Sequence, residues 1–214
     1  MLHPATCSVR QDGSVRVLME DEGGKLDLNF ANTVLMQRLF TGIGYSRAEA
    51  SKFADSIADY RDTDDARRLN GAVVEDYHRA GLSYGPANGP FMATEDLGHV
   101  LNIPRDLAAR LQLMVTVYSG TPVVDLAFVP PELAAALAGG TALAAGNRHD
   151  SGVSGCNAYT IHSRARSASG FKVDMAATVA MTPGGTRPHV VYRWTPTAPV
   201  SMPESETGST APAC

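Results

Sequence analysis

Five carboxylates within one short stretch are the residues with the clearest potential for chemistry. They are Asp62, Asp64, Asp65, Glu75 and Asp76. The turn-forming pair Asn70-Gly71 separates the first three from the last two, so a loop folded there would bring all five together. Their repulsion would oppose closure unless a cation neutralised it, and Ca²⁺ accepts about six to eight oxygen ligands in flexible geometry. The stretch therefore predicts a calcium site.

The same stretch has a second interpretation, as a solvated acidic loop. Arg61, Arg67 and Arg68 lie among the carboxylates and can form ion pairs with them. The pattern is not an EF-hand, because Ala66 and Arg67 stand where that loop needs a ligand and a glycine. Composition alone leaves calcium binding and arginine pairing both open.

Signatures of nucleophilic catalysis and of zinc binding are missing from the sequence. There is no G-x-S-x-G, the six histidines form no H-x-x-x-H pair, and the three cysteines form no C-x-x-C. The segment His149-Asp150-Ser151 contains triad residue types, but triads are spatial and adjacent side chains point apart. The sequence therefore predicts a protein without an enzymatic site.

A tight turn, Gly42-Ile43-Gly44, offers an alternative function. It lies between two predicted helices, as in helix-hairpin-helix modules that present backbone amides to a nucleic-acid phosphate. Residues 30–118 hold nine Lys or Arg and eleven Asp or Glu, however, and the whole chain has a net charge of −4. Phosphate binding needs a positive face, so the charge argues against nucleic acid as a partner.

Helices that would position these residues are predicted in the middle of the chain. Of the 214 residues, 44% are hydrophobic, which is enough to bury a core. Apolar residues recur at helical spacing over 33–42, and Ser46 with Glu49 forms a capping box for a second helix. The turn-rich stretch 62–90 predicts a long loop, and a helical pair follows over 97–114.

Strands are predicted on both sides of this helical region. Strict alternation over 171–181, with shorter runs at 159–162 and 190–194, predicts an antiparallel sheet with one face packed. Residues 15–19 and 25–29 predict a β-hairpin or a strand–turn–strand unit, and 124–129 predicts a strand before a short helix over 133–138. The expected domains are 1–29 and 119–195 for the β portion, 30–118 for an inserted helical domain, and 196–214 for a polar tail.

Several motifs in fixed order resemble the K-type minor pseudopilins of type II secretion. They are the run from Glu20 to Asn29 (EDEGGKLDLN), Asp62-Thr63-Asp64-Asp65, Asn70-Gly71-Ala72, the run from Tyr84 to Phe91 (YGPANGPF), and Leu111 to Tyr118. The resemblance extends through Trp194 and leaves only the tail outside. It implies an α+β fold, in which a pilin-type antiparallel sheet is interrupted by a large all-helical domain.

The resemblance also implies a role. Members of this family lack enzymatic activity, join the I-type and J-type minor pseudopilins at the pseudopilus tip, and support protein export across the outer membrane. They are single-pass proteins of the inner membrane with their folded portion in the periplasm. The N-terminal membrane helix is absent from this chain, which we attribute to truncation.

A calcium-binding acidic loop belongs to the family pattern as well, which adds to the expectation for the five carboxylates. One departure from that pattern is Val73-Val74, which stands between Asn70-Gly71-Ala72 and the acidic pair Glu75-Asp76. In the family the acidic residues commonly follow Asn-Gly-Ala at once. The insertion therefore shifts Glu75 and Asp76 along the chain from the positions of the family's acidic residues.

Overall fold

Two compact units make up the chain. The structure, a computed structural model, describes residues 5–9, 13–138, 156–182, 186 and 188–196, with the backbone alone for 5–9. One unit, the sheet unit, combines the residues up to Glu22 with those from Asn157 onward. The other, the helical unit, is Gly23–Cys156.

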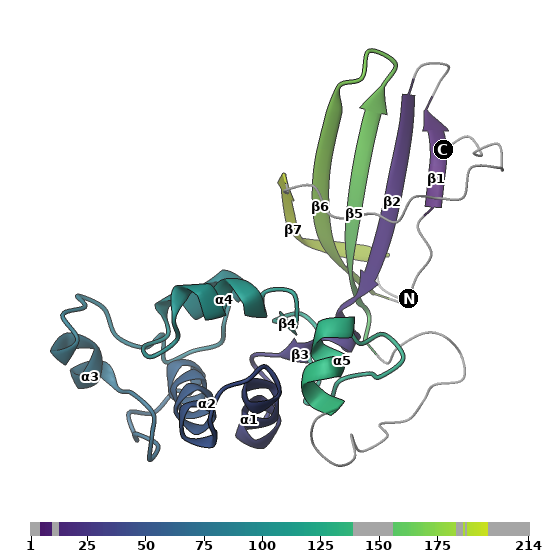
Figure 1. Ribbon diagram of the computed structural model, residues 1–214. Coiled ribbons are helices and arrows are strands. Elements are labelled where there is room, and N and C mark those ends of the chain that lie inside the picture. Colours follow the sequence, from purple (N-terminus) through teal and green to yellow (C-terminus); the bar gives the residue numbers. More distant parts are fainter. Residues whose placement is uncertain (1–4, 10–12, 139–155, 183–185, 187, 197–214) are drawn as a thin grey trace. The chain divides into compact units, whose positions relative to one another are not determined.

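The sheet unit is a five-stranded antiparallel sheet (Figure 1). Its strands, in spatial order, are β1 (Ala5–Val9), β2 (Gly13–Asp21), β5 (Ala158–Ser167), β6 (Lys172–Met181) and β7 (His189–Pro196). β2 pairs with β5 from Gly13 opposite Ser167 to Asp21 opposite Tyr159. These two strands are direct neighbours in space although the entire helical unit separates them in sequence.

The predicted strand over 171–181 is confirmed as β6, but the expected packing of its apolar face is wrong, because Val173 and Met181 are 41% and 44% exposed while Thr178 of the other face is buried. Ala177 lies opposite Ile161 of β5, and directly opposed residues of an antiparallel pair share a face, so the apolar residues of both strands line one side of the sheet. The predicted turn between β5 and β6 is present, with Gly170 at a positive φ of 86°. Of the expected tail, residues 197–214 lie outside the described residues.

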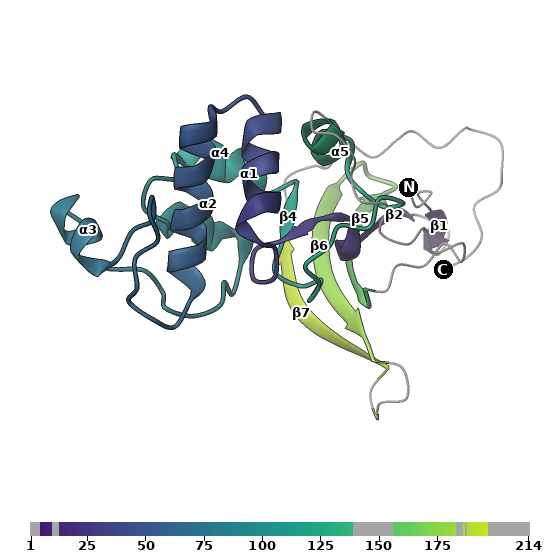
Figure 2. The same ribbon diagram turned by 90° about the horizontal axis from the view of Figure 1, so that it is seen from below.

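The helical unit contains five α-helices in its described residues. They are α1 (Thr33–Gly42), α2 (Arg47–Arg61), α3 (Val74–Arg79), α4 (Arg105–Leu111) and α5 (Pro131–Ala138), with 3₁₀ turns at η2 (Glu22–Gly24) and η3 (Thr94–His99). Figure 2 shows α1 and α2 side by side, and their aromatic residues Phe40 and Phe53 meet edge to face with ring centroids 5.3 Å apart. No helix of the described residues is both long and apolar enough to cross a membrane.

The ends of α1 and α2 form as the sequence predicts. Asn32 caps α1 by accepting a hydrogen bond from the Leu35 amide at 2.8 Å. The capping box of α2 is confirmed, because Ser46 Oγ accepts from the Glu49 amide while Glu49 Oε2 accepts from the Ser46 amide. α1 ends at Gly42, where an added Cβ would overlap the Ala136 carbonyl, so α5 packs directly on the α1 backbone.

The helical unit also holds two short strands, so it is not all-helical. β3 (Leu26–Asp27) and β4 (Val115–Thr116) pair in parallel, and the Leu26 amide donates to the Met114 carbonyl at 3.0 Å. Of the two arrangements predicted for 15–19 and 25–29, the strand–turn–strand unit is present as β2, η2 and β3, whereas the hairpin is wrong because β3 pairs with β4. The η2 turn takes the chain out of the larger sheet, and residues after it find partners about ninety positions further along.

Two other expected features differ from the structure. The stretch 62–90 is not a continuous loop, because α3 lies within it. No strand forms over 124–129, where the Phe128 amide donates to the Asp125 carbonyl in a turn, whereas the helix over 133–138 is confirmed within α5. The described residues of 23–29 and 119–138 are part of the helical unit. The boundaries of the two observed units therefore differ from those of the expected domains.

Candidate functional site

The five predicted carboxylates lie at and beyond the C-terminal end of α2, in two groups. Asp62, Asp64 and Asp65 begin the segment 62–71, which we call the acidic loop, while Glu75 and Asp76 lie in the first turn of α3. The side chains of Asp64, Asp65 and Glu75 are exposed, and those of Asp62 and Asp76 are half-buried.

Each of four carboxylates has its own partner within the protein. Asp62 forms an ion pair with Nη1 of Arg68. Asp64 Oδ1 accepts from the Ala66 amide at 2.9 Å, and Asp65 Oδ1 accepts from Nδ2 of Asn88 at 3.1 Å. The partners of the fourth, Asp76, are the Val73 amide, Arg79 and Arg67. The hydrogen bond from the Val73 amide is the main reason that the pKa of Asp76 lies below its usual value.

This arrangement does not gather the carboxylates as metal ligands. Among the described residues, no three acidic, histidine or cysteine side chains come together in a way that could hold an ion. The oxygen donors suit calcium in type, but the half-buried ones are paired with arginines. Calcium binding by these residues stays a prediction, and the arginine pairing that the sequence also allowed is present for Arg67 and Arg68.

Two acidic residues that sequence reasoning missed organise the acidic loop. Asp59 is 2% exposed, and its Oδ1 accepts from Nη1 of Arg68 at 2.7 Å. Asp55 Oδ2 accepts from both the amide and Nδ2 of Asn70, at 3.2 and 3.0 Å. Asp55 and Asp59 lie at i and i+4 on one face of α2, and Asp62 follows at the C-cap, so the end of the helix presents three carboxylates to the loop. That spacing was visible in the sequence.

The family-like motifs before α1 and after α3 meet in the helical unit. Asn29 and Phe91 exchange two hydrogen bonds, from Asn29 Nδ2 to the Phe91 carbonyl and from the Phe91 amide to Asn29 Oδ1. Asp27, 1% exposed, accepts from the amides of Asn29 and Gly120. Arg61 does not pair with the carboxylates but donates to the backbone carbonyls of Leu28 and Ala31.

The Gly42-Ile43-Gly44 turn does not present its amides to a ligand. The amides of Ile43 and Gly44 donate to carbonyls of α1, and the Tyr45 amide donates to Phe40. The N-terminus of α2 already holds an anion, because the hydrogen bonds from the Ser46 hydroxyl and amide keep the Glu49 carboxylate charged and lower its pKa. The geometry therefore gives no support to phosphate binding at this turn.

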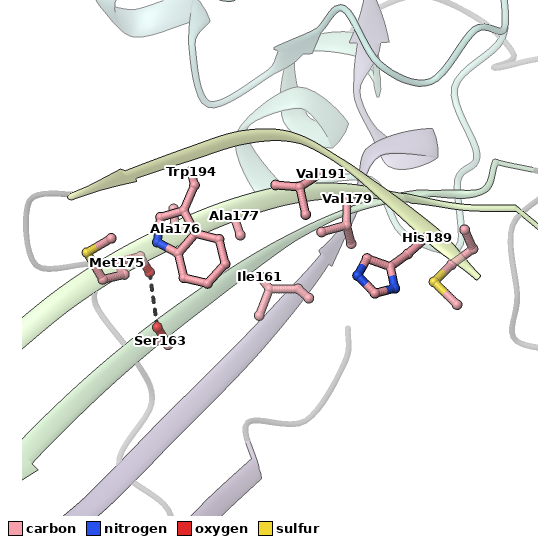
Figure 3. A pocket seen from close by; sticks show the side chains of 10 residues that line it. Ile161, Ser163, Met175, Ala176, Ala177, Val179, His189, Val191 and Trp194 are labelled. Atoms are coloured by element: carbon pink, nitrogen blue, oxygen red, sulfur yellow. Dashed lines mark hydrogen bonds between the residues drawn. The ribbon is translucent and has the colours of Figure 1, made fainter. Parts of the chain in front are cut away.

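A hollow of about 380 Å³ lies on the apolar face of the sheet, over β5, β6 and β7. Figure 3 shows Trp194 over this hollow, with Ile161 and Val179 along its floor. Trp194 is 67% exposed. The one hydroxyl in the lining, Ser163 Oγ, is directed to the Met175 carbonyl at 3.5 Å. The lining suits apolar contact better than chemistry on a bound molecule.

Comparison with known proteins gives two matches. Residues 17–120 match the model of a family described as type II secretion system (T2SS), protein K. The chain is also similar to a chain in the crystal structure of the GspK-GspI-GspJ complex from the type 2 secretion system of enterotoxigenic Escherichia coli. That likeness has a TM-score of 0.69 at 13% identity, and covers 92% of this chain and 84% of that chain. No curated protein matched. The likeness confirms the α+β class with an antiparallel sheet.

Proposed function

Because this chain belongs to the protein K family of the type II secretion system, we propose that it is a non-enzymatic subunit of the pseudopilus tip that supports protein export. The observation that carries the proposal is that the family match and the fold likeness point to the same kind of protein, although they cover different lengths of the chain. The family match ends at residue 120, whereas the fold likeness covers 92% of the chain and so reaches the C-terminal strands.

The partners that fit this role are the I-type and J-type minor pseudopilins. Support comes from the solved structure with the similar fold, which is a complex of K, I and J proteins. The apolar face of the sheet is a surface on which subunits of this kind could pack. The bulk of the helical unit would then hinder the addition of a further subunit above this one.

Co-purification tests the assembly. The full chain, mixed with the I-type and J-type proteins of the same secretion system at micromolar concentration, should elute from a sizing column as one ternary complex. Each protein alone and each pair serve as controls. Separate elution of all three would contradict the proposal, and salt-sensitive retention of duplex DNA would favour the helix-hairpin-helix alternative instead.

The location proposed for this portion is the periplasm, with attachment to the inner membrane by a single N-terminal helix. The family membership supports a membrane-associated periplasmic component. Fractionation of cells that carry the full-length gene tests this: the protein should remain with the inner membrane and be degraded by protease added to spheroplasts. Protection from that protease would contradict it.

Calcium is a separate proposal, supported by the oxygen-rich composition of the acidic loop and by the family resemblance. To bind an ion, Asp62 and Asp76 would have to exchange their arginine partners for it. A ligand that binds only the folded state at about a hundred times its dissociation constant adds about 2.7 kcal/mol of stability. A melting temperature that is the same in EDTA and in millimolar CaCl₂, with no calcium found by elemental analysis, would remove the proposal.

A further inference from the structure

We propose that Arg68 is the internal cation that closes the acidic loop in the metal-free protein, at the place where the family resemblance implies calcium. The proposal concerns how this loop is held and does not depend on tip assembly. Four of the five carboxylates expected to bind calcium have partners within the protein, and Asp62 and Asp76 are paired with arginines.

Arg68 contacts two carboxylates at the C-terminal end of α2. Its Nη1 is 2.7 Å from Asp59 Oδ1 and also pairs with Asp62, the C-cap residue of the helix. Its backbone amide lies 3.4 and 3.2 Å from the two oxygens of Asp59. Both oxygens of the buried Asp59 carboxylate are thus occupied by a single residue of the loop.

Burial makes this pairing a requirement. Asp59 is 2% exposed, and a carboxylate taken out of water without a partner is strongly unfavourable. The Arg68 side chain is 40% exposed, so it reaches inward from the surface and is not itself fully desolvated. Nη1 of the guanidinium supplies a positive charge to two carboxylates that a bound metal ion would otherwise neutralise.

The backbone beyond Arg68 follows closely against the same helix face. The Asn70 amide donates to Asp55, and the Gly71 amide donates to the Arg68 carbonyl at 3.2 Å. A Cβ added to Gly71 would overlap Asp59 Oδ2, so the loop lies directly on the carboxylate. Arg68 and the residues up to Gly71 therefore form one closed segment, held by contacts within the chain.

Hydrogen exchange of the full chain in EDTA tests the proposal. A peptide covering residues 66–73 should be protected in the unaltered protein, lose most of that protection in Arg68→Gln, and regain part of it in Arg68→Lys. Arg67→Gln is the matched control, because Arg67 is 54% exposed and pairs with Asp76 at 3.4 Å, not with Asp59. It should leave the peptide protected.

Two results would overturn the proposal. One is a peptide that exchanges freely in EDTA and becomes protected only when CaCl₂ is added, which would assign closure to the metal. The other is equal protection in the unaltered protein and in Arg68→Gln. Calcium binding to the unaltered protein with unchanged protection in EDTA supports the proposal, because the loop is then closed before the ion arrives.

A double variant covers the case in which Arg68→Gln does not fold. Asp59→Asn combined with Arg68→Gln removes both charges of the buried pair. If the uncompensated Asp59 carboxylate causes the failure, the double variant should recover soluble, folded protein that Arg68→Gln alone does not give. A double variant that behaves no better than the single one would overturn the proposal.

Discussion

The close approach of Gly71 to Asp59 predicts a large effect from one added methyl group. In Gly71→Ala the new Cβ would overlap a carboxylate oxygen, and either the loop or the ion pair with Arg68 must shift. We expect a loss of about 1–3 kcal/mol in unfolding free energy, measured by urea titration. Gly98→Ala is the matched control, because nothing lies within 4 Å of its new Cβ. Equal stability of the two variants would contradict the account of the loop.

Tyr77 predicts a loss of stability at alkaline pH. Its side chain is fully buried, and desolvation raises the pKa of its phenol to about 12. The folded protein holds this proton more tightly than the unfolded chain, whose tyrosine pKa is about 10. The stability from Tyr77 is therefore fully present below about pH 10 and is lost as the pH rises towards about 12.

Urea unfolding at pH 9 and pH 11 measures this effect. The unaltered protein should lose more stability between the two pH values than Tyr77→Phe does. Tyr77→Phe itself should cost about 1 kcal/mol at neutral pH, because the Leu101 amide loses its acceptor at 2.9 Å. Tyr84→Phe, at a 40% exposed position, is the control. The same pH response in all three proteins would refute the role of Tyr77.

At the scale of one element, the N-terminus of α2 depends on its capping box. Ser46→Ala removes the acceptor for the Glu49 amide and the hydroxyl bonded to the Glu49 carboxylate at 2.6 Å. The expected cost is about 1 kcal/mol in unfolding free energy, within the usual range for lost caps. Ser83→Ala, at an exposed loop position, should change stability by less than about 0.5 kcal/mol. Similar values for both would show that the box contributes little.

Elements with strong local signals were predictable, and elements that depend on distant partners were not. α1, α2 and β6 carry a repeated period or a cap within their own residues, so the sequence indicates them. β3 and β4 have two residues each and exist only as a pair across the helical unit. α3 is a single short helix among turn-forming residues, with too few positions to show a period.

The candidate site divides in the same way. The acidic residues could be predicted as a cluster because they lie close together in the sequence. Their partners could not be predicted, because the pairing depends on how the acidic loop folds back on α2. Asp59 could be identified from its i+4 spacing with Asp55, but its burial under the acidic loop is seen only in the structure. The choice between calcium and arginine could not be made from types and spacing, because both interpretations use the same residues.

At the scale of the whole molecule, the hydrophobic core lies in one unit. Every residue of the main buried cluster falls between Leu26 and Leu137, within the helical unit. A fragment of residues 23–156 should therefore fold by itself, with a cooperative thermal transition and dispersed amide signals in NMR spectra. A fragment that shows helix content without a cooperative transition would contradict this expectation.

The adjacency of β2 and β5 has a consequence for the order of folding. A chain released from its N-terminus onward, from a ribosome or a translocation channel, presents β2 long before its neighbour β5 exists. At about 5–20 residues per second, the interval is on the order of ten seconds. During that time β2 has β1 alone as a partner, and its other edge is open to unrelated strands. We expect the helical unit to fold in this interval and the sheet to be completed last.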